Sequence, residues 1–326
     1  MTFVMRVYYF FFYLWLCASR SIETMPIIEV NGLTRRYKDT KNKSTYTAVD
    51  NLSFHVERGE VFGLLGTNGA GKTSSLEVME GLAEPDEGSV RIYELDPCRE
   101  RERLRPELGI MLQSGGLPSQ LTVEETLRMW AGTLSTPLPI EEVAEAVELT
   151  HRMNVKVGAL SGGEQRRLDL GCALAGNPSV VFLDEPTTGL DPENRRHTWE
   201  LLRSLKERGV TMVLTTHYLE EAEFLCDRLA IMHQSRIVRE GTVSELVGQE
   251  NASLTFTTGH PVPNIFSGTR HHDGHRYTVH TRHLQADTYA LLDWAARQQI
   301  ELRDFRAQPA SLETVFMNIA GSTTQV

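Results

Sequence analysis

The sequence predicts an α/β domain with a mostly parallel sheet, followed by a small α+β domain at the C-terminal end. A glycine-rich turn at 66–73 lies between an apolar strand and a helix-forming stretch. Apolar runs at 61–65, 180–183, 211–215 and 229–232 show little alternation, as is typical of parallel strands covered on both faces. Near Gln249 the composition changes to shorter, alternating strands. We therefore expect one domain over 26–249 and a second over 250–326.

The composition is that of an ordinary globular protein and disfavours one class of partner. Of the 326 residues, 40% are hydrophobic and 23% are charged, which is enough apolar material for a sizeable core. The net charge of -10 argues against nucleic-acid binding, which usually requires a basic patch. The four cysteines are widely spaced, so we expect reduced thiols and a cytosolic protein.

The first residues, 1–25, are either an apolar leader or the product of an upstream mis-start. The apolar run at 7–18 follows Arg6 and resembles a signal-peptide core. It is shorter than the roughly 20 residues that cross a bilayer as a helix. Met25 directly precedes a strand-like run at 27–30, and we favour it as the true start. Whether 1–25 are present in the mature protein stays open, with a membrane-associated leader as the alternative.

The turn at 66–73 matches the phosphate-binding pattern GxxxxGK[ST] in full. Glycines let successive backbone N–H groups turn towards phosphate, and the following helix start adds its positive dipole end. Lys72 is predicted to reach the β- and γ-phosphates, and the Thr73 hydroxyl to ligate Mg²⁺. The predicted nucleotide-binding residues of this turn and the helix start are Gly66, Thr67, Asn68, Gly69, Ala70, Gly71, Lys72, Thr73 and Ser74.

Polar side chains at three strand ends complete a candidate catalytic site. Asp184 ends the apolar run at 180–183 and is predicted to hold Mg²⁺ through water. Glu185 follows it and is the predicted general base for an attacking water. Gln113 follows the run at 109–112 and is predicted to bond Mg²⁺ or that water. His217 follows the strand at 211–215 and is placed to sense the γ-phosphate.

A second anion site is predicted at the start of another helix. Ser161, Gly162 and Gly163 precede a helix-forming stretch at 164–174, whose free N–H groups and serine hydroxyl suit a phosphate. Asp191, in the turn at 189–191, is predicted to touch a partner chain. One chain with two anion sites needs a second chain to use both.

In this order the motifs resemble those of the ATPase subunits of ABC transporters, over about residues 27–246. They are Walker A (66–73), the Q-loop (Gln113), the signature (160–165), Walker B (180–185), the D-loop (189–191) and the switch histidine (His217). The resemblance implies a P-loop NTPase fold with antiparallel N-terminal strands and a helical subdomain at about 114–165. It also implies ATP and Mg²⁺ as cofactors, and a homodimer in which the signature of one subunit covers the ATP of the other.

Two positions need comment within that resemblance. Tyr37 is the implied aromatic residue stacking on adenine, with Tyr46 as a rival. Glu164 stands where the family usually has glutamine, and it leaves Ser161 and the glycines intact.

The C-terminal end resembles one subgroup, the drug-resistance (daunorubicin and multidrug) exporters of bacteria, at 309–316 (PASLETVF). The resemblance implies a separately encoded membrane permease, a cytoplasmic position at the inner membrane face and outward transport. An importer ATPase or a regulatory ATPase without a permease is the alternative. The transported molecule and the identity of the permease are not readable from this chain.

Other patterns predict local structure. In the C-terminal domain we expect strands at 253–257 and 276–280, a helix at 285–298 and a last strand at 300–305. The histidine-rich run at 271–275 is interpreted as a hairpin with an Asp-Gly turn, in preference to a metal site. A solvated helix face is expected for Glu220, Glu221 and Glu223. A packed helical face is expected for Leu127, Trp130, Val143, Ala146 and Val147.

Overall fold

The structure is a computed structural model that describes residues 25–38, 44–113 and 115–321. The predicted leader, apart from Met25, lies outside the described residues. No helix in the described ranges is long and apolar enough to cross a membrane.

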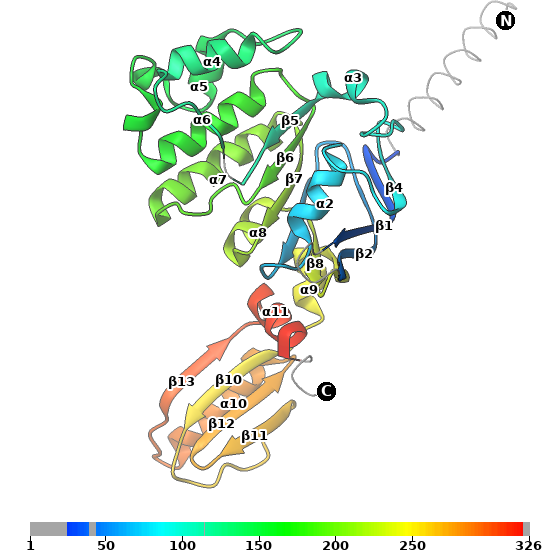
Figure 1. The fold of residues 1–326 in the computed structure, drawn as a ribbon. Helices are drawn as coiled ribbons and strands as arrows, with labels where there is room; N and C mark the ends of the chain where they lie inside the picture. Colours follow the sequence, from blue (N-terminus) through cyan, green and yellow to red (C-terminus); the bar gives the residue numbers. More distant parts are fainter. Residues whose placement is uncertain (1–24, 39–43, 114, 322–326) are drawn as a thin grey trace, which may run out of the picture.

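A mostly parallel sheet forms the centre of the fold (Figure 1), as the apolar runs predict. Its order is β5-β6-β7-β3-β8-β9, and of the strand pairs that the described residues form within this sheet only β8–β9 is antiparallel. Every residue of β3, β6 and β7 is buried, which explains the lack of alternation. The strands are β3 (Val61–Gly66), β5 (Leu108–Met111), β6 (Val180–Asp184), β7 (Thr211–Thr216), β8 (Arg228–His233) and β9 (Arg236–Thr242).

The register of the parallel strands brings the predicted site together. Leu65 of β3 pairs with Thr216 of β7, and Asp184 of β6 pairs with Thr215. The segments that leave β3, β6 and β7 therefore start at the same edge of the sheet. They carry the phosphate loop, the acidic pair and the switch histidine.

An antiparallel sheet of order β2-β1-β4 packs beside the central sheet, as the resemblance implies. Phe54 of β2 stacks on Phe62 of β3 with ring centroids 4.8 Å apart. Helix α2 follows the phosphate loop and buries Leu76 and Met79 in the same cluster. The elements are β1 (Ile28–Lys38), β2 (Thr45–Val56), β4 (Glu87–Ile92) and α2 (Lys72–Met79).

Helices α4, α5 and α6 pack on one another beyond the edge strand β5 (Figure 1). Leu127, Val143 and Val147 form the expected packed face, but Trp130 does not join it and is 40% exposed. Trp130 lies beside the C-terminal end of α6 instead, where it lines a groove. The helices that follow β4 and precede the C-terminal sheet are α3 (Arg101–Leu104), η1 (Arg105–Glu107), α4 (Val123–Ala131), α5 (Ile140–Ala146), η2 (Thr150–Arg152), η3 (Val157–Ala159), α6 (Gly162–Leu174), α7 (Pro192–Glu207), α8 (Leu219–Leu225) and α9 (Val243–Gly248).

The C-terminal sheet has the order β11-β12-β10-β13, with α10 packed on it. The histidine-rich run forms the predicted hairpin between β11 and β12. The predicted last strand starts too early, because Ile300 still closes the end of α10 by donating its N–H to the carbonyl of Ala295. The elements are β10 (Ala252–Thr257), β11 (Thr269–Asp273), β12 (Arg276–Thr281), α10 (Leu284–Arg297) and β13 (Arg303–Gln308).

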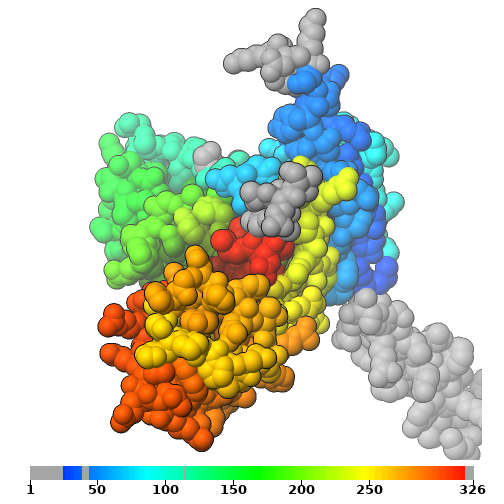
Figure 2. All heavy atoms as spheres, turned by 90° about the horizontal axis from the view of Figure 1, so that it is seen from below, coloured from blue at the N-terminus to red at the C-terminus, as the bar shows by residue number. Residues whose placement is uncertain are grey.

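The last helix, α11 (Leu312–Gly321), returns to the first part of the chain. Leu312 and Val315 are buried in the large core cluster, and the Leu312 N–H donates to Glu223 Oε1 at 3.2 Å. Figure 2 shows α11 (red) lying between the C-terminal sheet (orange) and the green segments of the first part.

Candidate functional site

The phosphate loop is shaped by one glycine in particular. Gly71 has φ 100, and a Cβ at this position would lie 2.2 Å from the Ala48 carbonyl oxygen. Only glycine therefore fits where the loop turns into α2. Thr67, Asn68 and Gly69 are exposed, Ala70 is buried, and Thr73 and Ser74 lie on the first turn of α2.

Lys72 is buried and already engaged. Its Nζ donates to the carbonyl oxygens of Gly66 at 2.9 Å and Thr67 at 3.2 Å, and it lies 3.6 Å from Glu185 Oε1. Burial lowers the pKa of this ammonium group, and the carboxylates of Asp184 and Glu185 oppose that shift. The lysine donor is thus held between the start of the phosphate loop and Glu185.

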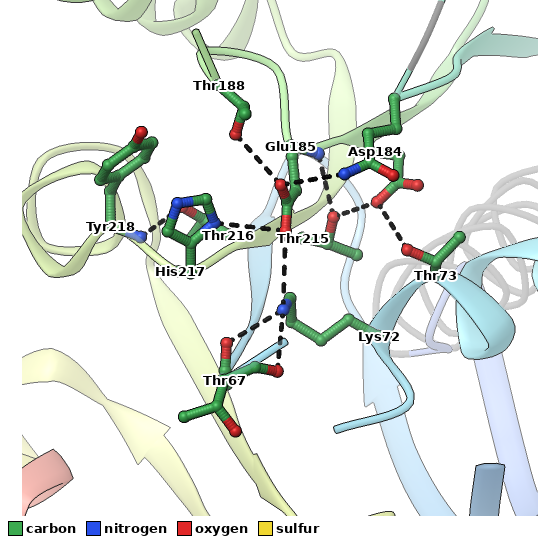
Figure 3. A network of polar contacts seen from close by, with 12 residues as sticks. Thr67, Lys72, Thr73, Asp184, Glu185, Thr188, Thr215, Thr216, His217 and Tyr218 are labelled. Atoms are coloured by element: carbon green, nitrogen blue, oxygen red, sulfur yellow. Dashed lines mark hydrogen bonds and ion pairs between the residues drawn. The ribbon is translucent and has the colours of Figure 1, made fainter. Parts of the chain in front are cut away.

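Asp184 is held by two hydroxyl groups (Figure 3). Thr73 Oγ1 donates to Asp184 Oδ1 at 3.3 Å, and the Thr215 hydroxyl donates to the same oxygen. Hydroxyl and carboxylate oxygens are the ligands that Mg²⁺ prefers. Two of the three residues predicted to hold Mg²⁺, Thr73 and Asp184, are therefore adjacent and carry a suitable donor set, while the third, Gln113, contacts Glu185.

Glu185 is the centre of the polar network in Figure 3. Its Oε2 accepts from Gln113 Nε2 at 3.3 Å and from the Thr188 hydroxyl at 3.1 Å. His217 Nδ1 lies 3.2 Å from Glu185 Oε1. Burial alone would raise the pKa of this carboxyl, but the nearby His217 ring, the Thr188 hydroxyl and the charge of Lys72 lower it below its usual value. Glu185 is thus kept ionised, as a proton acceptor requires.

The signature lies at the capped start of α6. The Ser161 hydroxyl accepts from the Glu164 N–H at 3.2 Å, and Glu164 Oε2 accepts from the Ser161 N–H at 2.8 Å. Arg152 Nε donates to the other oxygen of Glu164 at 2.6 Å. The glutamate at the fifth signature position thus completes a capping box. Ser161 and Gly162 remain exposed, so their polar groups are accessible from outside the chain.

Asp191 caps the next helix and lies near the signature. Its Oδ1 accepts from the N–H groups of Glu193 at 3.1 Å and Asn194 at 3.0 Å at the start of α7. A Cβ added at Gly163 would lie 2.5 Å from Asn194 Oδ1, so this glycine permits the close approach of α6 and α7. The signature and the D-loop are therefore neighbours on the surface.

The two rival tyrosines stand opposite each other on β1 and β2. Their rings stack with centroids 5.6 Å apart, and the Tyr37 hydroxyl donates to Glu77 Oε2 of α2 at 2.9 Å. Tyr46 is the more exposed, at 57%. The structure therefore presents an aromatic pair beside the phosphate-loop helix.

The expectation of a solvated face on α8 is wrong for Glu221. This side chain is fully buried, and its Oε1 accepts from the Thr187 hydroxyl at 2.7 Å and from Trp199 Nε1 at 2.9 Å. Burial raises the pKa of Glu221 against the effect of these hydrogen bonds. Glu221 has the same residue type as Glu220 and Glu223, which are exposed, so residue type alone predicted a solvated side chain. The apolar residues Ala222 and Leu225, which are buried, mark the inward face of the helix on which Glu221 lies.

The histidines of the C-terminal hairpin lie on β11 and β12 and in the turn between them. Within the ranges that the structure describes, no group of three or more His, Cys, Asp or Glu side chains could hold a metal ion.

Comparisons with known proteins identify the family of this chain. Residues 49–188 match the family described as ABC transporter, and 257–311 match an ABC transporter-like C-terminal domain. Nod factor export ATP-binding protein I of Burkholderia thailandensis is 37% identical over 306 residues, which cover 91% of this chain and 98% of that protein. The chain belongs to the ATP-binding proteins of ABC transporters. It is an ABC-type ATPase, as its motifs predict.

Other similar proteins are exporter components and isolated cassettes. Doxorubicin resistance ATP-binding protein DrrA of Mycobacterium tuberculosis is 35% identical over 325 residues, covering 91% of this chain and 95% of that protein. An ABC transporter ATP-binding subunit of known structure aligns with a TM-score of 0.60 at 28% identity, covering 68% of this chain and 92% of that one. A cassette solved as a post-hydrolysis dimer with ADP and phosphate aligns with a TM-score of 0.59 at 26% identity, covering 66% and 98%.

Proposed function

We propose that two copies of this ABC ATPase share two ATP sites and drive export through a separately encoded membrane permease. The observation that carries the proposal is the position of Ser161 and Gly162 on the surface, at a helix start suited to phosphate. The phosphate loop, by contrast, meets acidic residues of its own chain, because Thr73 donates to Asp184 and Lys72 lies 3.6 Å from Glu185. A second copy brings the two anion sites together, and a similar cassette is known as a dimer.

ATP and Mg²⁺ fit the residues at the strand ends. The triphosphate would lie on the phosphate loop, with adenine against the Tyr37–Tyr46 pair, whose rings offer a flat apolar surface beside α2. Mg²⁺ would be held by Thr73, by Asp184 through water and by Gln113, and it would neutralise phosphate charge. The signature residues Ser161, Gly162 and Gly163, together with Asp191, would come from the partner.

In the hydrolysis step Glu185 accepts a proton from water. The water oxygen attacks the γ-phosphorus, the bond to the bridging oxygen breaks and ADP leaves with its negative charge. Gln113 orients the water from the other side, because its amide already lies 3.3 Å from Glu185 Oε2. Phosphate draws Lys72 away from Glu185, which frees that carboxylate for the water. His217 donates to the γ-phosphate and keeps Glu185 in place.

The permease contact is assigned to the groove beside β5. This groove has a volume of about 510 Å³ and is lined by the C-terminal ends of α2, α4 and α6 together with α3, η1 and β5. Leu82 and Trp130 are large apolar side chains at its rim, 52% and 40% exposed. β5 ends at Met111, two residues before Gln113, so an exposed apolar rim beside it suits a permease segment that must follow the state of the ATP site. This contact would place the subunit on the cytoplasmic face of the membrane.

A comparison of small molecules inside and outside cells tests the direction of transport. Cells in which Glu185→Gln replaces the native chain are compared with native cells and with cells carrying Glu84→Gln, an exposed glutamate away from the site. Export predicts that one or more compounds accumulate inside the Glu185→Gln cells and decline in the medium. The opposite change would show an importer. No change in either compartment would favour a regulatory ATPase without a permease.

A further inference from the structure

The signature helix carries a buried arginine that faces the active site of its own subunit. Arg166 lies on the first turns of α6 and is only 7% exposed. Its guanidinium donates to main-chain carbonyls of two strand ends. They are Leu112 at 2.8 Å, Gln113 at 3.1 Å, Asp184 at 2.9 Å, Glu185 at 2.9 Å and Pro186 at 2.9 Å.

These contacts fix the main chain of Gln113 and Glu185, whose side chains are proposed to bind the attacking water. Nη1 holds the carbonyl of Gln113, and Nη2 holds the carbonyl of Glu185. Glu185 has φ 46, a left-handed conformation that costs free energy for a residue with a side chain and persists only when its surroundings hold it. On the other side, its N–H donates to the Thr215 hydroxyl at 3.0 Å. The guanidinium therefore sets the separation of Gln113 and Glu185.

Lysine cannot reproduce this arrangement. The guanidinium is planar and offers five N–H donors in a rigid fork, whereas an ammonium group offers three donors from one point. The nearest carboxylate, Asp169, is 3.8 Å away on the same helix, so the main-chain dipoles carry most of the interaction.

The same helix begins at Ser161, the residue that would meet the ATP of the partner. Ser161 is the N-cap of α6 and Arg166 lies five residues later, less than two turns along the helix, whose start is held by the capping box. A small tilt of α6 on contact with the partner's phosphate therefore moves the guanidinium relative to the two strand ends.

We propose that Arg166 is a positioning residue that aligns Gln113 with Glu185 for hydrolysis and links this alignment to the partner's ATP. The inference rests on the proposed roles of Gln113 and Glu185. We expect the loss of the Arg166 guanidinium to lower the rate of hydrolysis and to leave ATP affinity unchanged.

The test measures kcat, KM and thermal stability for Arg166→Lys and Arg166→Gln. The matched control is Arg228→Lys, because Arg228 also bridges strands through its guanidinium but contacts Glu60, Glu240 and the His55 carbonyl. Misplacement of catalytic groups by about 1 Å costs up to roughly 100-fold, so kcat should fall at least tenfold with KM within twofold. An equal rise in KM, or an unchanged kcat, overturns the proposal. The proposal is also overturned if neither Arg166 variant folds while Arg228→Lys does, because Arg166 would then be a structural residue.

A double-mutant cycle separates positioning from a merely structural role. In a Gln113→Ala background the alignment no longer exists, so Arg166→Lys should lower kcat by a much smaller factor than in the native chain. The same factor in both backgrounds overturns the proposal. Undiminished turnover in Glu185→Gln alone would instead overturn the proposed base, whatever Arg166 does.

Discussion

Replacing Glu80 by glutamine should stabilise the protein, and increasingly so at higher pH. Glu80 follows α2, is 6% exposed and has one oxygen, Oε1, without a hydrogen-bond partner. Burial, with the charges of Asp184 and Glu77, raises the pKa of this carboxyl from 4.5 to about 8. The folded protein therefore favours the neutral acid, which glutamine imitates.

The sign and size follow from proton linkage. Between pH 4.5 and about 8 the unfolded chain has lost this proton while the folded chain retains it, so stability falls as pH rises. The penalty is about 1.5 kcal/mol at pH 5.5 and about 4.5 kcal/mol at pH 8.5, at about 1.36 kcal/mol for each pKa unit. Glu80→Gln removes this penalty, and any fixed cost of the amide is the same at both pH values.

Urea unfolding followed by tryptophan fluorescence, without nucleotide or magnesium, measures the effect. The free energy of unfolding of Glu80→Gln minus that of the native chain should increase by about 3 kcal/mol from pH 5.5 to pH 8.5. Glu84→Gln, a change of the same kind at an exposed position, should shift the free energy by less than about 0.5 kcal/mol at either pH. A Glu80→Gln difference that is the same at both pH values would refute the reasoning.

Further substitutions test other contacts. Gly71→Ala should abolish ATP binding in calorimetry, because its Cβ would meet the Ala48 carbonyl at 2.2 Å, whereas Gly69→Ala, which meets nothing within 4 Å, should lose less affinity. Trp199→Phe should lower the free energy of unfolding by roughly 1–3 kcal/mol in urea, because Glu221 loses a buried donor, while Trp130→Phe should change it little. Ser161→Ala and Thr242→Ala each remove the cap of a capping box and should each cost about 1 kcal/mol in thermal unfolding. Only Ser161→Ala should also reduce ATP turnover; a similar loss in Thr242→Ala would show an effect of stability alone.

The sequence predicted the elements that carry strong local signals. Buried strands such as β3 and β6 have uninterrupted apolar runs, and the phosphate loop has a fixed glycine pattern, so both could be located from residue types and spacing. The capping box of α6 was also readable, since Ser161 and Glu164 are three residues apart.

Other features depend on contacts between distant segments. Arg166 resembles any helical arginine until the ends of β5 and β6 are placed around it. Glu221 belongs to an acidic run, and only its packing against Trp199 and Thr187 buries it. Trp130 has the spacing of a core residue, yet the neighbouring helices leave that side of α4 open.

Mixing two inactive variants is the most direct test of an ATP site shared between subunits. Lys72→Met removes the phosphate-loop cation, and Gly162→Asp puts a carboxylate where the partner's phosphate would lie. Gly162 tolerates a side chain, because an added Cβ meets nothing within 4 Å. Each variant alone should be inactive. In an equal mixture half of the dimers are hybrids with one intact site, so turnover should recover to about a quarter of the native value. A mixture no more active than its components would contradict the shared site.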